Sequence, residues 1–138
     1  MNYFTDLEGD AKTLNRCFRI LKFNPSDGYA NDKIASIHYA KARSVWEIYQ
    51  AESKEVFEKK KPLTWESVER WEKLIAEFRS ELDKTEFYLE NIQKGDRHEM
   101  NKKTILSSLK ENRKIDPTID KQFEEYRKYL TAMGHSKK

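Results

Sequence analysis

Residues 68–92, VERWEKLIAEFRSELDKTEFYLENI, carry apolar side chains at alternating intervals of three and four positions. The repeat consists of Val68, Trp71, Ile75, Phe78, Leu82, Thr85, Leu89 and Ile92, of which only Thr85 is polar. A heptad pattern of this length is typical of a long helix that packs side by side against another helix. We therefore predict a helix over residues 65–93, and we call the repeating residues the seam.

The stretch just before the seam, residues 59–67 (KKKPLTWES), combines the signals that end one helix and begin the next. Pro62 is incompatible with a helix interior, and Thr64 is a favourable residue type for capping the helix that follows. We expect the lysines at 59–61 in the last turn of the preceding helix, where cations interact well with the helix dipole. The pattern indicates a tight turn between two helices.

A second long helical pattern covers residues 31–60 and begins near Asn31 or Asp32. Its apolar residues are spread over more than half of the helix circumference between positions 34 and 49. A helix with so wide an apolar surface packs against two or more neighbours. Because the two long helices have similar lengths and a short connection, we predict that they form an antiparallel hairpin.

A shorter amphipathic pattern precedes the hairpin. It covers residues 11–23, with Asp10 as its expected N-cap, and it stops before Pro25 because the residue preceding a proline avoids the helical conformation. Its apolar positions are Leu14, Cys17, Phe18 and Leu21.

Two further helices are predicted after the hairpin. Residues 98–113 form the weaker pattern, with Met100, Ile105, Leu106 and Leu109 as its expected contacts. Asp116 followed by Pro117 predicts an N-cap and the first residue of a last helix, whose apolar face extends to Met133. The predicted fold is an all-α helical bundle in a single domain, residues 1–138, with frayed ends at 1–10 and 134–138.

Composition agrees with this fold and limits the functions. Among 138 residues there are only 4 glycines and 3 prolines, which favours long helices. The net charge of +3 is too small to indicate nucleic-acid binding by itself. The acidic start has no signal-peptide pattern, and no stretch is apolar enough to span a membrane. We therefore expect a cytoplasmic protein without a membrane contact.

Residues that could carry chemistry are few and scattered. His38, His98 and His135 do not have the spacing of helical metal sites. Cys17, the one cysteine, lies on an apolar helix face, where a thiol is inert, and His38 is expected in or near the core. The sequence contains no glycine-rich phosphate loop. We predict no enzymatic activity, no metal and no cofactor.

Three groups of basic residues are the candidate binding sites. A tryptophan beside lysines in the predicted turn suits a protein partner, whereas basic rows along helices suit phosphates or an acidic protein surface. The groups are Lys59, Lys60, Lys61 and Trp65 in the turn; Lys12, Arg16, Arg19 and Lys22 in the first helix; and Lys103, Ser107, Lys110 and Lys114 in the helix after the hairpin.

The predicted function follows from what remains. The chain is expected to be a small non-enzymatic protein-binding module, such as an adaptor, an inhibitor or an assembly or accessory subunit of the kind found in phages and mobile elements. The alternative is a nucleic-acid-binding or nucleoprotein-complex subunit that uses the basic faces 12–22 and 102–114. A homodimer that pairs through the seam, from Val68 to Ile92, is a third hypothesis.

Overall fold

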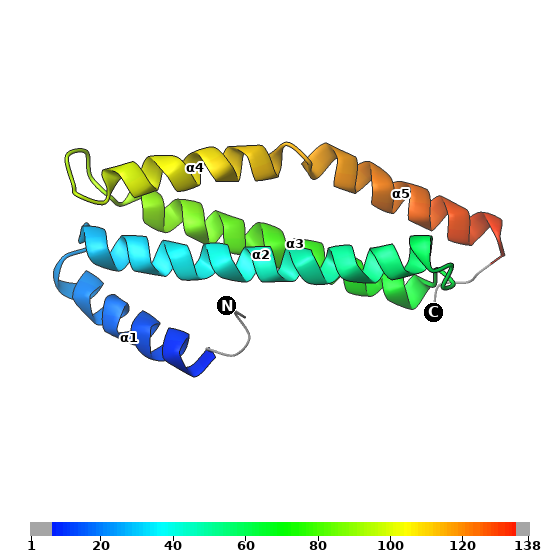
Figure 1. Ribbon diagram of the computed structural model, residues 1–138, viewed down its shortest axis with the longest axis horizontal. Helices are drawn as coiled ribbons and strands as arrows, with labels where there is room; N and C mark the ends of the chain where they lie inside the picture. Colours follow the sequence, from blue (N-terminus) through cyan, green and yellow to red (C-terminus); the bar gives the residue numbers. More distant parts are fainter. Residues whose placement is uncertain (1–6, 135–138) are drawn as a thin grey trace.

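The computed structural model describes residues 7–134, which are folded entirely into helices and their connections. The helices are α1 (Leu7–Phe23), α2 (Gly28–Glu58), α3 (Trp65–Glu90), α4 (Glu99–Arg113) and α5 (Asp116–Ala132). The long helices α2 and α3 form the predicted antiparallel hairpin, and α4 and α5 follow each other along it (Figure 1). Helix α1 packs against the first part of α2. The predicted all-α bundle is confirmed.

The seam of α3 forms the centre of the molecule. Every seam residue is buried, and even the largest of them, Trp71, is only 1% exposed. Thr64 caps the helix as predicted, because its side-chain oxygen accepts a hydrogen bond of 3.1 Å from the backbone N–H of Ser67. The seam prediction and the start of this helix are therefore confirmed.

The core is divided along the length of the hairpin. At one end, Leu109 of α4 packs with Leu82 and Leu89 of α3. At the other end, four residues of α5 cover Trp71 and Ile75; they are Ile119, Phe123, Tyr126 and Leu130. A third cluster joins Cys17 of α1 to α2. The wide apolar surface of α2 is thus explained by neighbours on several sides.

The first two helices begin earlier than predicted. Helix α1 starts at Leu7, so Asp10 lies inside it rather than at its N-cap, and residues 7–10 are helical rather than frayed. The rest of the predicted frayed ends, 1–6 and 135–138, lies outside the described residues. Helix α2 starts at Gly28 because Asp27, and not Asn31 or Asp32, caps it through a 2.9 Å bond from Ala30 N–H.

The boundaries on the C-terminal side of each long helix also differ. Helix α2 ends at Glu58, so the lysines at 59–61 follow its last turn instead of forming it. Helix α3 ends at Glu90 rather than at residue 93.

The start of α5 differs from the prediction by one residue. Asp116 is the first residue of α5 and not its N-cap, because its carboxylate instead accepts a 3.1 Å hydrogen bond from Arg79 Nε of α3.

Three apolar residues that were expected to pack are exposed to solvent. Met100 is 73% exposed because nine positions, two and a half helical turns, place it opposite the buried Leu109. Met133 is 59% exposed because it follows the last turn of α5, beyond Leu130. Phe18 lies at the edge of the packed face of α1 and is 40% exposed.

Candidate partner-binding groove at the end of the hairpin

The histidine and cysteine side chains of the described residues lie at contacts between helices. His38 Nδ1 donates a 2.5 Å hydrogen bond to Glu81 Oε2, which joins α2 to α3 inside the protein. His98 Nδ1 lies 2.8 Å from Asp32 Oδ2 and joins α4 to α2. Cys17 is fully buried, and burial raises the pKa of its thiol. His38 and Cys17 occupy the core positions that the sequence predicted for them.

Within residues 7–134, no three side chains of the types His, Cys, Asp and Glu lie close enough together to hold an ion. Nor does any helix there have an apolar stretch long enough to span a bilayer.

A groove of about 580 Å³ opens where α2 ends, between the α2–α3 turn and α5. We call it the tip groove. Its lining consists of Val56, Phe57, Lys60, Lys61, Pro62, Leu63, Glu125, Tyr126 and Tyr129. Two segments far apart in the chain, residues 56–63 and residues 125–129, thus contribute to one surface.

The apolar part of the tip groove is built from aromatic rings that the core supports. Phe57 and Tyr129 are each 53% exposed, although both are large apolar side chains. The ring of Phe57 stacks on Tyr126 with centroids 5.4 Å apart, and it also contacts Trp71 at 6.4 Å. Because Tyr126 and Trp71 are buried, the exposed face of Phe57 is held in a fixed position.

The other part of the groove is positively charged. Lys61 Nζ lies 3.0 Å from Glu55 Oε2, and Lys59 Nζ lies 4.0 Å from the other oxygen of the same carboxylate. The hydrogen bond from Lys61 holds the pKa of Glu55 below its ordinary value. Lys60 has no carboxylate partner among the described residues. Glu125 lines the groove from α5.

Of the four turn residues that the sequence predicts as a binding site, only two line the tip groove. Lys60 and Lys61 line the tip groove, whereas Lys59 caps α2 beside it. Trp65 is half-buried and packs against the same core cluster as Trp71, so it does not line the groove.

Sequence reasoning missed the aromatic residues of the groove. Tyr129 does have a recognisable signal, because it falls outside the spacing of the buried residues of α5 and is therefore an aromatic residue on an exposed face. Phe57 has no comparable signal, since it belongs to the wide apolar surface of α2.

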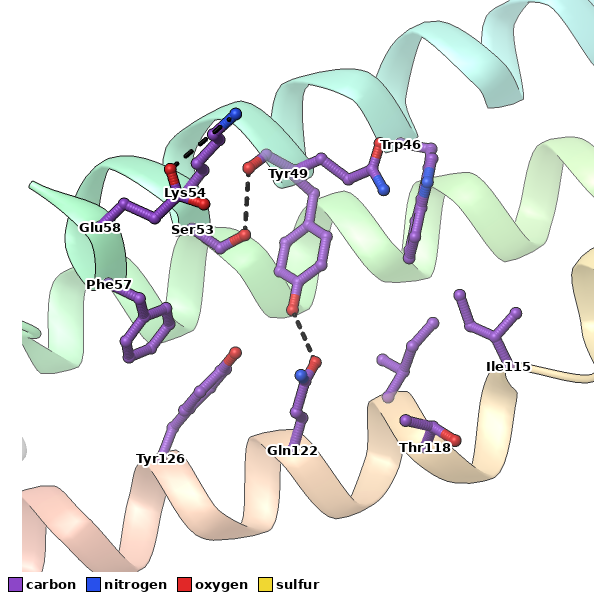
Figure 2. A pocket seen from close by; sticks show the side chains of 12 residues that line it. Trp46, Tyr49, Ser53, Lys54, Phe57, Glu58, Ile115, Thr118, Gln122 and Tyr126 are labelled. Carbon is purple, nitrogen blue, oxygen red and sulfur yellow. Dashed lines mark hydrogen bonds and ion pairs between the residues drawn. The ribbon is translucent and has the colours of Figure 1, made fainter.

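A second hollow adjoins the tip groove. This cleft of about 490 Å³ lies between α2 and α5, and Phe57 and Tyr126 line both depressions. Figure 2 shows Tyr49 pointing from α2 toward Gln122 of α5, to which its hydroxyl donates a 3.3 Å hydrogen bond. Burial raises the pKa of Tyr49, so its phenol remains a neutral donor. Because Tyr49 and Tyr126 are buried, the exposed ring that the two depressions share is that of Phe57.

The two predicted basic faces exist, but on separate helices. Lys12, Arg16, Arg19 and Lys22 are all exposed on α1, and Lys103, Ser107, Lys110 and Lys114 are all exposed on α4 or at its end. Helices α1 and α4 flank the hairpin on opposite sides (Figure 1). The structure therefore does not combine the two rows into one surface. Lys114 is in addition paired with Glu111 at 2.8 Å.

No known protein family, curated protein or solved structure matches this chain.

Proposed function

We propose that the chain is a non-enzymatic protein-binding module and that the tip groove is its contact surface. One observation carries the proposal: the rings of Phe57 and Tyr129 are half exposed at a groove edged by lysines. An adaptor, an inhibitor or an assembly subunit requires such a surface and no catalytic group.

The energetics favour a partner at these rings. Burying a large aromatic side chain contributes about 1.5–3 kcal/mol relative to leaving it in water. The ring of Phe57 is already positioned by Tyr126 and Trp71, so a partner loses little free energy in ordering it. Rigid aromatic residues of this kind carry much of the binding energy in protein interfaces.

The proposal is tested by affinity capture from the native host lysate. The immobilised chain is expected to retain a protein that remains bound after nuclease treatment. Tyr129→Ala should lose that protein, whereas Phe87→Ala should keep it, because Phe87 is 62% exposed on α3 but lies outside the groove. Retention that depends on nucleic acid, or that is the same for both variants, would contradict the proposal.

A nucleic-acid-binding or nucleoprotein subunit is the second candidate. Arg16, Arg19 and Lys22 are exposed and form no ion pair within the described part of the chain. Phe23, at the end of the same helix, is 91% exposed. A cationic row beside an exposed ring is the combination that binds single strands, since phosphates contact the cations and a base stacks on the ring.

Binding to duplex and single-stranded DNA and RNA over a salt series tests this second candidate. The affinity should fall steeply with salt, and Arg16→Ala with Arg19→Ala should weaken binding and reduce the slope. Phe23→Ala should weaken only single-strand binding. The absence of binding at low salt would remove this candidate.

A further inference from the structure

We propose that the tip groove binds an acidic linear segment of a partner protein, an inference that rests on the proposed protein-binding function. A large aromatic or aliphatic side chain of the segment would lie against Phe57 and Tyr129. Carboxylates of the segment would lie against the lysines of the turn. The charges, the composition of the groove and one backbone conformation support this assignment.

The lysines of the turn outnumber the carboxylates that could neutralise them. Glu55 is shared by Lys59 and Lys61, and the nearby Glu58 lies 3.9 Å from a different lysine, Lys54. Lys60 has no acidic partner in residues 7–134. This side of the groove consequently keeps positive charge, and acidic residues on a partner would increase both the rate and the selectivity of binding.

Glu125 gives the groove a polarity. It contributes the acidic group on the α5 side, whereas Lys60 and Lys61 belong to the turn. A segment complements both sides of the groove when its acidic edge faces the lysines and its other edge, which faces Glu125, is neutral or basic. A continuous polyanion such as nucleic acid fits less well, because its phosphates would also approach Glu125.

The backbone of Lys60 supports a role for its side chain. Its φ of 56° lies in the left-handed region, which side chains with a Cβ disfavour. At Gly95 and Gly134, the other positions with positive φ in the described residues, the chain has glycine. Glycine is also the usual residue just after a helix end. A lysine at this position therefore lowers stability relative to glycine, and such strain is often found at functional sites.

The test begins with a random peptide library displayed on phage and selected on the immobilised full chain. We expect enrichment of peptides that combine one large aromatic or aliphatic residue with several Asp or Glu residues. An enriched peptide is then synthesised with a fluorescent label, and its affinity for variants of the chain is measured by anisotropy.

Lys60→Gly is the decisive variant because it separates binding from folding. It should weaken peptide binding about two- to fivefold, the range of exposed charge pairs, while raising Tm by about 2–4 °C. Lys60→Arg should keep the affinity. Tyr129→Ala should weaken binding about tenfold or more. Lys73→Gln, a loss of charge on an exposed position of α3 outside the groove, should change neither quantity.

Several outcomes would overturn the inference. These are a selection without enrichment, enriched peptides without acidic residues, and unchanged affinity in Lys60→Gly. Saturable single-stranded DNA binding that Tyr129→Ala abolishes would identify nucleic acid as the occupant, and a doubled mass that Tyr129→Ala reverses would identify a second copy. If lysate capture still depends on Tyr129, the proposed protein-binding function survives while the acidic segment is rejected.

Discussion

A buried polar pair connects the two long helices. His38 and Glu81 are each 8% exposed, and their hydrogen bond connects α2 with α3. The ring of His38 also lies parallel to that of Tyr88, with centroids 6.1 Å apart. Burial is the largest single influence and raises the pKa of the Glu81 carboxyl, but the hydrogen bond and the electrostatic attraction from His38, together with the charges of Lys84 and Lys41, outweigh it, so the net shift is downward. The carboxylate is consequently ionised in the folded protein at neutral pH.

The first prediction concerns this pair. A depressed pKa means that ionised Glu81 contributes stability above its unfolded pKa, near 4.5, and that the contribution is lost as pH falls through the lower folded value. Glu81→Gln should therefore lower the free energy of unfolding by about 1–2 kcal/mol at pH 7 and by less in acid. Urea denaturation at several pH values measures this difference. The exposed Glu77→Gln is the control, and a difference that does not shrink in acid would refute the linkage.

The second prediction concerns Gly28 at the start of α2. The carboxylate of Asp96 occupies the space that a Cβ at this position would need, and its Oδ1 is held by a 2.8 Å bond from His98 N–H. Alanine normally favours a helix over glycine, but here Gly28→Ala should cost about 1–3 kcal/mol in stability. Thermal unfolding measures the change. Adding Asp96→Ala should make Gly28→Ala neutral or stabilising, whereas equal effects in both backgrounds would exclude the steric explanation.

The third helix shows how position along an element decides the role of a residue. Trp71 is a seam residue, and its Nε1 donates a 3.1 Å hydrogen bond to Glu52 of α2. Tyr49, Phe57 and Tyr126 surround its ring. Trp65 lies at the open end of the same helix and is only half-buried. The end of the helix is therefore less buried than its middle, although both residues are tryptophans.

The third prediction compares these two tryptophans. Trp71→Ala should destabilise the protein by about 3–5 kcal/mol, since it removes a buried ring and leaves a cavity. Trp65→Ala should cost less stability, because Trp65 is only half-buried. The sequence predicts that this change affects partner binding more than folding, but Trp65 does not line the tip groove, so we expect little effect on partner binding. Chemical denaturation together with the capture assay measures both effects. An equal or larger loss of stability in Trp65→Ala would mean that Trp65 is a core residue.

In the whole molecule, the apolar seam of the hairpin is covered by other helices of the same chain. The seam contacts α2 and is closed by α4 at one end and α5 at the other. A homodimer through Val68–Ile92 would require α2 and α3 to separate, which would expose the residues of both core clusters. The tip groove, in contrast, is accessible without any such rearrangement.

The fourth prediction is therefore that the protein is a monomer. Sedimentation experiments over a wide concentration range should give the mass of a single chain. The physical reason is that a seam buried in its own chain offers no apolar surface to a second copy. A mass that doubles with concentration would contradict this expectation. Tyr129→Ala would then show whether the contact uses the tip groove or an exchanged hairpin.

The sequence by itself determined the helical class, the hairpin, the seam and the turn. These features depend on periodic burial along one helix and on local breaking and capping signals, which neighbouring residues such as Pro62 and Thr64 carry. Only the tertiary structure decided that Asp116 pairs with Arg79 instead of capping α5, and that Phe57 and Tyr129 share one groove. Both are contacts between residues far apart in the chain, and they depend on how α5 docks on the hairpin. Local periodicity carries no information about that docking, so the groove became visible only once the helices were packed together.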